Sequence, residues 1–291
     1  MGQNVAVSRH EAMVEWPTDR SDFDVDRVRV GVVTASWNTR DLLARMLYGV
    51  LRVVEGGTIV EVVVVDNGSE DGSRELAQRL ADEGIIRFID NTSQRYHGPA
   101  LTQGVNVLAD LARHAEPVDL IWALDSDVFV LRPDVVRAAA AAMSSLDAVF
   151  AADPDDYAPS PPRVTTERLS MCSTLFDPAI VWQSGHRPFL EDGDPSRHMQ
   201  ADLTGAGHRR LAFPFCSDGY VLHLGRGTLA QVAARDATDN RYHSWAIERH
   251  EPHFALRPDG TELARSFERR YRAAVPDDSV DTLVAGLGDA S

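Results

Sequence analysis

Two aspartates separated by one serine, Asp125-Ser126-Asp127, are the residues of this chain whose types and spacing most directly suggest chemistry. They follow the apolar run at 120–124, which is typical of a strand buried in a sheet. Strand alternation points residues i and i+2 to the same side, so both carboxylates would lie together. A hard divalent cation that also binds a diphosphate would relieve their repulsion. The alternative is a solvated loop whose aspartates cap the next helix.

The elements that would position these aspartates alternate between strand and helix. Apolar runs predict strands at residues 28–35, 61–65, 85–89, 120–124 and 147–152. Helical periodicity and suitable first-turn residues predict helices at residues 42–51, 74–81, 99–114 and 134–143. This alternation is typical of a parallel α/β sheet, in which ligands bind at the carboxyl ends of the strands. Because two strands end in acidic turns, at Asp66 and at Asp125, we expect an anionic ligand or a metal at that edge.

Composition narrows the class of protein. The chain has 291 residues and a net charge of −15, and 44% of its residues are hydrophobic and 25% charged. This length and composition predict an ordinary globular protein with ample core. The negative charge argues against nucleic acid or an anionic membrane as the main partner. No run approaches the ~18 apolar residues of a membrane span, and we expect a cytoplasmic protein. Cys172 and Cys216 fit no metal or redox spacing and are expected to be buried, reduced thiols.

The chain divides into four parts by pattern. Residues 1–27 predict a mobile tail or an arm packed on an edge, and residues 28–155 hold the alternating strands and helices. A stretch rich in Pro, Asp and Ser at 153–163 predicts a linker or a long surface loop before a second part at 156–232. That part shows a turn at 202–205 followed by a helix-like run at 207–211. A C-terminal extension, 233–291, contains a helix candidate at 262–274.

Four motifs in sequence order resemble the nucleotide-sugar glycosyltransferases of the GT-A type, especially the inverting family 2. They are residues 33–38, residues 66–73, the Gly-centred turn and helix at 96–101, and the Asp-x-Asp triplet 125–127. The resemblance covers residues of about 28–155 at the family's typical spacing, and it matches the second half more loosely. It implies a Rossmann-like, mainly parallel sheet flanked by helices, with a C-terminal half that forms the acceptor side.

The resemblance also implies a set of residues that bind the nucleotide-sugar donor. The set is Thr34, Ser36, Asp66, Asn67, His97, Gly98, Asp125 and Ser126. Asp66 would contact the nucleoside base, because a carboxylate accepts from the imide N–H that uracil, thymine and guanine share. A plain β-turn explains Asp66-Asn67-Gly68-Ser69 equally well, and the two roles are compatible.

A metal ion follows from the same resemblance. Asp127, with Asp125, would hold Mn²⁺ or Mg²⁺ bridging the two phosphates, and Asp125 would face the ribose or the metal. His223, which follows a late apolar strand and precedes a Gly-rich turn, is the candidate third protein ligand. Imidazole favours Mn²⁺ over Mg²⁺. The alternative is a packed or capping histidine.

Inverting transfer also needs a general base that deprotonates the acceptor. In the family this is an acidic residue of the second half near the start of a helix, and Asp202 is the candidate. The acidic loop with Glu191, Asp192 and Asp194 competes with it, and its alternative reading is a solvated turn.

Three arginines and three histidines are further candidates for the site. Arg209, Arg210 and Arg226 could hold the diphosphate, although most surface arginines bind no phosphate. The histidines at 243, 250 and 253 fit no simple metal spacing and suit a helix or the wall of an acceptor pocket.

The sequence therefore predicts a metal-dependent glycosyltransferase with a small-molecule, peptide or carrier-linked acceptor, and an oligomer is possible. A nucleotidyltransferase is the first rival, but residues 35–38 replace the Gly-rich basic loop that it requires. A non-catalytic module that binds a sugar nucleotide or a partner is the second, because the usual acidic pair near Asp202 is absent.

Overall fold

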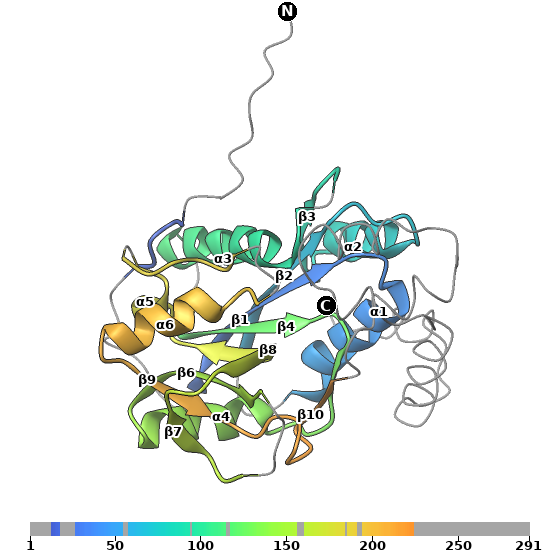
Figure 1. Ribbon diagram of the computed structural model, residues 1–291. Helices are drawn as coiled ribbons and strands as arrows, with labels where there is room; N and C mark the ends of the chain where they lie inside the picture. The colour runs from blue at the N-terminus through green and yellow to red at the C-terminus, as the bar shows by residue number, and fades with distance from the viewer. Residues whose placement is uncertain are drawn as a thin grey trace, which may run out of the picture.

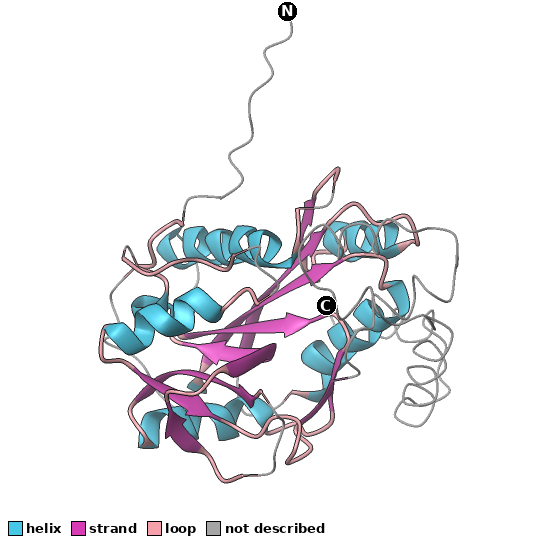
Figure 2. Cartoon of the chain, viewed as in Figure 1, coloured by secondary structure: helices cyan, strands magenta, loops and turns pink. Residues whose placement is uncertain are grey.

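A computed structural model describes residues 13–17, 27–54, 58–93, 95–114, 117–155, 160–183, 185–190 and 194–223. The strands are β1 (Arg29–Ser36), β2 (Thr58–Asp66), β3 (Arg87–Asp90), β4 (Leu120–Asp125), β5 (Val128–Val130), β6 (Ala148–Pro154), β7 (Arg163–Thr165), β8 (Leu169–Phe176), β9 (Arg209–Ala212) and β10 (Val221–His223). The helices are α1 (Arg40–Tyr48), the π-helix η2 (Gly49–Val53) that continues it, α2 (Ser73–Asp82), α3 (His97–His114), α4 (Val135–Ser145), α5 (Pro178–Val181) and α6 (Arg197–Gly205). Figures 1 and 2 show helices on both sides of a central sheet.

The sheet has eight strands in the order β3-β2-β1-β4-β8-β6-β9-β7. Strands β3, β2, β1 and β4 are mutually parallel, whereas β8 is antiparallel to β4 and to β6. A separate ribbon pairs β5 with β10 in antiparallel register. The mainly parallel α/β architecture predicted from the sequence is confirmed.

Strand alternation produces a core on each face of the sheet. Val32 and Trp122 belong to one cluster with the buried faces of α1, α2 and α4, while Val33 and Ile121 belong to the other with α3, α5 and α6. Strands buried on both faces need apolar residues at every position, which explains the continuous runs in the sequence.

The two parts of the chain divided at residue 155 share one sheet. Strand β8 comes from the second part, yet it lies between β4 and β6 of the first. The boundary at residue 155 therefore does not separate two sheets among the described residues, and the division into a nucleotide-sugar half and an acceptor half stays a prediction.

The N-terminal segment behaves as an arm where it is described. Trp16 is buried, and its amide donates to the Trp182 carbonyl at 3.1 Å. The amide of Val14 donates to Asn106 Oδ1 at 2.9 Å. Residues 1–12 and 18–26 lie outside the described part.

Two secondary-structure predictions for the second half are wrong. Residues 202–205 form the end of α6, and the helix expected at 207–211 is strand β9. Gly207 explains both errors, because its φ of 82° ends the helix, and the next amide, of His208, donates back to Leu203 O. The helix-terminating signal of this glycine was in the sequence.

Candidate functional site

The carboxyl ends of β1, β2 and β4 meet at one edge of the sheet. The register sets Ser36 opposite Asp66 and Ala35 opposite Asp125, so both acidic turns flank the end of β1. This edge brings together the residues predicted for the donor site.

Asp66 lies at the centre of the first turn. Its Oδ1 accepts from the amides of Gly68 and Ser69 at 3.0 and 2.8 Å, and its Oδ2 accepts from Ser69 Oγ at 2.5 Å. Burial raises the pKa of Asp66, and these hydrogen bonds offset part of that rise. Asp66 thus stabilises its own turn, and its contact with a nucleoside base stays a prediction.

The neighbouring polar groups extend this turn toward α3. Asn67 Nδ2 donates to the Tyr96 carbonyl at 3.1 Å, and Ser36 Oγ lies 3.0 Å from Thr39 Oγ1. Thr34 is fully buried, and its Oγ1 makes no hydrogen bond among the described residues. Such an orphaned hydroxyl is expected beside a site that a polar ligand completes.

The start of α3 carries the next two predicted residues. His97 Nε2 lies 3.3 Å from Asp125 Oδ1. Gly98 packs so closely against the next segment that a Cβ there would lie 1.9 Å from the Leu190 carbonyl oxygen. Gly98 therefore permits residues 189–190 to pass directly over the start of α3.

The Asp-x-Asp triplet joins β4 to β5, and β10 brings His223 to it. Asp125 ends β4, and the pairing of β5 with β10 sets His223 opposite Val128, the residue after Asp127. His223 Nε2 lies 3.4 Å from Asp127 Oδ1 and 3.6 Å from Asp125 Oδ2. The three residues thus gather although 96 positions separate Asp127 from His223.

These three side chains fit one divalent cation. Their candidate ligand atoms all lie within 4.8 Å of one another, and two carboxylates with one imidazole suit Mn²⁺ or Mg²⁺. Adjacent ligands at bonds of about 2.1 Å lie about 3.0 Å apart in an octahedral shell. The observed 3.4 and 3.6 Å are close to that separation.

The charge state of His223 in the metal-free protein follows from its neighbours. Burial lowers the pKa of His223, but the charge of Asp127 and hydrogen bonds with Asp127 and Cys172 outweigh that effect, so the pKa lies well above its usual range. A protonated imidazole neutralises part of the charge of the two aspartates. A metal ion requires the neutral ring, so it would replace this proton.

Both cysteines are free thiols, and Cys172 is buried as predicted, whereas Cys216 is half-buried. Cys172, Cys216 and Asp153 place their candidate ligand atoms within 4.8 Å of one another, behind His223. Burial raises the pKa of Asp153 to about 6. The hydrogen bond with Cys216, together with burial, raises the pKa of Cys172 well above its usual range. No spacing rule could show this cluster, because three different elements build it.

Asp202 is engaged elsewhere in the fold. It lies in the last part of α6, where its Oδ1 is 2.6 Å from Arg187 Nη2 and its Oδ2 accepts from the Arg187 amide at 2.9 Å. Arg187 lowers the pKa of Asp202 through this hydrogen bond. Figure 1 shows that α6 ends at the side of the sheet where β4 begins, away from the carboxyl end of β4.

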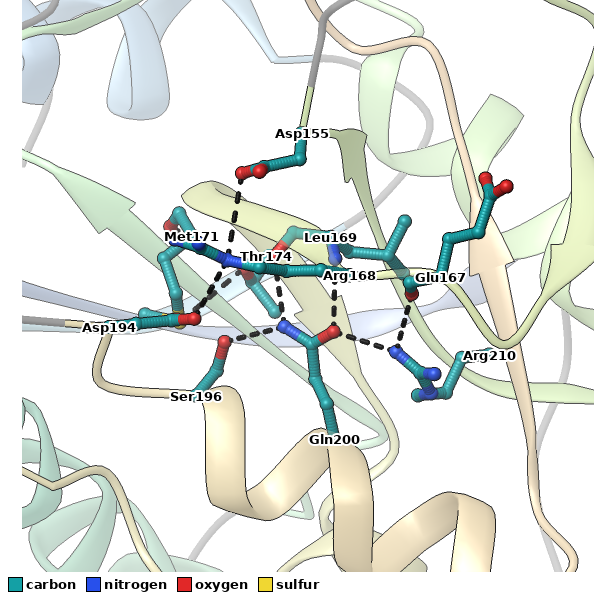
Figure 3. Close-up of polar contacts among 10 residues, drawn as sticks. All are labelled: Asp155, Glu167, Arg168, Leu169, Met171, Thr174, Asp194, Ser196, Gln200 and Arg210. Atoms are coloured by element: carbon teal, nitrogen blue, oxygen red, sulfur yellow. Dashed lines mark hydrogen bonds and ion pairs between the residues drawn. The ribbon is translucent and has the colours of Figure 1, made fainter.

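Asp194, by contrast, lies just before α6. One of its carboxylate oxygens is 2.8 Å from Nε of Arg168, the residue that precedes β8 (Figure 3). Strand β8 runs antiparallel to β4 with Ser173 opposite Leu124, so the start of β8 lies toward the carboxyl end of β4. The Leu190 amide donates to the Pro195 carbonyl, which connects Asp194 to the segment that covers Gly98. Glu191 and Asp192 lie outside the described residues.

Arg210 is a structural residue. Figure 3 shows its guanidinium beside Gln200 and the start of β8, where it donates to Gln200 Oε1 at 2.7 Å and to the Glu167 carbonyl at 3.0 Å. Arg210 is buried, whereas Arg209 is exposed and donates to the Leu146 carbonyl. These contacts leave neither arginine directed at Asp125, Asp127 and His223, which we call the Asp125 group. Arg226, His243, His250 and His253 lie outside the described residues.

Comparisons with known proteins agree with the fold. The model of Glycosyl transferase family 2 matches residues 31–187. A mannosyltransferase from Pyrobaculum calidifontis, solved in complex with GDP-Man and Mn²⁺, has a TM-score of 0.50 at 17% identity over 89% of this chain and 79% of its own. TarS from S. aureus has a TM-score of 0.50 at 16% identity over 88% of this chain and 50% of its own. No curated protein matches the sequence.

Proposed function

The chain belongs to glycosyl transferase family 2 and has the GT-A fold of a nucleotide-sugar glycosyltransferase, and on that premise we propose that it transfers a sugar from a nucleoside diphosphate with the help of a divalent metal and with inversion. The observation that carries the metal dependence is the cluster of Asp125, Asp127 and His223 at the carboxyl edge of the sheet. Ligands of open α/β sheets bind at this edge.

The donor would lie along the ends of β1 and β2. Asp66 and the orphaned Thr34 hydroxyl would line the base pocket, with Ser36 and Asn67 beside them. His97, Gly98 and Ser126 would border the ribose and diphosphate. Asp66 already accepts three hydrogen bonds within its turn, so the turn itself holds the carboxylate in position for a base N–H.

Asp127 and His223 would hold the metal, and Asp125 would hold the metal or the ribose. A bound ion there stabilises the charge that develops on the leaving diphosphate. The imidazole ligand favours Mn²⁺ over Mg²⁺. His97, 3.3 Å from Asp125, would orient that carboxylate.

We propose Asp194 as the general base, in place of Asp202, the candidate from the sequence. Asp202 forms a close ion pair with Arg187 in the last part of α6. Asp194 precedes α6 beside Arg168, and its neighbour Pro195 accepts from Leu190, the residue that covers Gly98. A carboxylate in this position would take the proton of the acceptor hydroxyl as that oxygen attacks the anomeric carbon.

The acceptor would enter from the side of α6 and β8. We expect it to be a small molecule, a peptide or a carrier-linked molecule. No helix in the described part of the chain has the length and apolar character needed to cross a bilayer.

Thermal unfolding with nucleotides tests the proposal directly. A nucleoside diphosphate at about 100 times its Kd should raise the Tm by roughly 5–10 °C with Mn²⁺ present, and it should do so only with a divalent ion. Asp127→Asn should lose this shift, and Asp110→Asn, which removes an exposed carboxylate on α3, should retain it. An equal shift without metal would contradict the metal role.

A panel of UDP- and GDP-linked sugars then identifies the donor. Slow hydrolysis with release of the nucleoside diphosphate is expected for one member of the panel. Binding without any turnover would favour a non-catalytic module.

A further inference from the structure

A cluster of two thiols and a carboxylate lies next to His223 of the candidate donor site. Asp153 comes from the end of β6, Cys172 from β8, and Cys216 from the segment that follows β9. Asp153 and Cys172 are 0% and 2% exposed, and Cys216 is half-buried. Three elements that are distant in sequence thus converge on one small volume.

The contacts within the cluster point its polar atoms at one another. Asp153 Oδ1 accepts from the Cys216 amide at 2.9 Å, which fixes the orientation of the carboxylate. Asp153 Oδ2 lies 3.8 Å from Cys172 Sγ. The Cys172 and Cys216 thiols lie within 4.8 Å of each other and of the carboxylate.

These separations are close to those of a tetrahedral zinc site. With Zn–S bonds of about 2.3 Å and Zn–O bonds of about 2.1 Å, neighbouring sulfur and oxygen ligands lie about 3.6 Å apart. The observed separation of Asp153 Oδ2 and Cys172 Sγ is 3.8 Å. This pair of ligand atoms therefore already has nearly the spacing that a zinc ion requires.

The ligand types separate this cluster from the Asp125 group. Sulfur ligands select Zn²⁺ and similar soft cations, whereas two carboxylates and one imidazole suit Mn²⁺ or Mg²⁺. We propose that Asp153, Cys172 and Cys216 form a second metal site, specific for Zn²⁺ or a cation of similar softness. A divalent ion coordinated by sulfur displaces the thiol proton to solvent, so both cysteines would bind as thiolates.

The position of this site indicates a structural role. Cys216 begins the segment that leads to β10, and the Phe215 carbonyl accepts from the Val221 amide at 3.0 Å. A metal at Cys216 would tie this segment to β6 and β8. Since β10 carries His223, and His223 contacts Cys172, the zinc site would support the histidine that completes the first metal group.

Metal titration of the full-length, reduced and metal-stripped chain tests the site. Cd²⁺, which absorbs in the near ultraviolet when thiolates bind it, is the spectroscopic probe, and Zn²⁺ should displace it. We expect one equivalent of thiolate-bound Cd²⁺ per chain. Mg²⁺ should not compete for the thiolate signal.

Variants distinguish the two metal groups without relying on activity. Cys216→Ser keeps the backbone contact to Asp153 and should lower zinc affinity by more than the roughly 10–100-fold expected for loss of a supporting residue. Asp127→Asn, which alters the other group, should retain the full Cd²⁺–thiolate signal. Cys172→Ser is the second test, with far-ultraviolet circular dichroism to establish that it folds.

Three outcomes would overturn the proposal. They are a wild-type chain without a thiolate–metal signal, a Cys216→Ser chain that binds Zn²⁺ as tightly as wild type, and a signal lost in Asp127→Asn. None of these outcomes bears on sugar transfer, so failure here leaves the proposed function standing.

Discussion

At the scale of single residues, the contacts of two aspartates favour Asp194 over Asp202 as the proposed base. Asp202 is bound to Arg187 through both oxygens, and Asp194 stands at the opposite end of α6 beside Arg168. Asp202 was expected near the start of a helix, but it lies in the last part of α6, which ends just before Gly207. The identity of the general base stays a prediction, and the residue proposed for it is Asp194.

Replacing each aspartate with asparagine separates the two assignments. Asp194→Asn should lower the transfer rate by roughly 10²–10⁴-fold, because the acceptor hydroxyl loses its proton acceptor, and should leave the metal-dependent nucleotide shift intact. Asp202→Asn should leave both properties close to wild type. Transfer assays with the donor found in the panel measure the rates, and loss of transfer in Asp202→Asn alone would reverse the assignment.

The buried carboxylate of Asp66 predicts a pH dependence of stability. Burial raises the pKa of Asp66 above its usual range, so the folded chain binds that proton more tightly than the unfolded chain. Its contribution to stability is therefore complete below the unfolded value and is lost as the pH rises through the folded value. The folded chain is therefore less stable toward unfolding when Asp66 is ionised than when it is protonated.

Asp66→Asn tests this reasoning. The amide oxygen can accept from Gly68 and Ser69, and the amide nitrogen can donate to Ser69 Oγ, so the turn keeps its hydrogen bonds. Urea unfolding from about pH 4 to pH 7 should show a smaller loss of stability with rising pH than in wild type. Nucleotide affinity should fall about 10–100-fold, because a charged acceptor is lost. An unchanged pH slope would contradict the assignment of the raised pKa.

At the scale of elements, close packing of α3 on the sheet depends on one glycine. A Cβ at Gly104 would lie 2.2 Å from Val33 Cγ2 and 3.4 Å from Val65 Cγ2. Glycine inside a helix usually costs up to about 1 kcal/mol relative to alanine. Here the approach of the helix to β1 and β2 explains its presence.

Gly104→Ala should therefore destabilise the protein by about 1–3 kcal/mol despite the better helix propensity of alanine. The matched control is Gly205→Ala at the exposed end of α6, where a Cβ meets nothing within 4 Å. That variant should change stability by less than about 1 kcal/mol. Denaturant unfolding measures both, and a stabilised Gly104→Ala chain would show that the interface relaxes freely.

At the scale of the whole molecule, the features that the sequence predicted are those that depend on neighbouring residues. The parallel strands, their acidic ends and the helices between them follow from apolar runs and turn residues such as those around Asp66 and Asp125. The insertion of β8 between β4 and β6, and the meeting of Cys172 with Cys216, depend on long-range pairing. No spacing of motifs along the chain encodes such pairing.

The β5–β10 ribbon has a consequence for how the chain folds. During synthesis Asp125 and Asp127 emerge long before His223, and they lie beside it only once β10 has paired with β5. Contacts of such high sequence separation form late and slowly. The Asp125 group would thus acquire its full set of ligands among the last steps of folding. Tight binding of a metal ion by all three residues would therefore indicate that β10 has paired with β5.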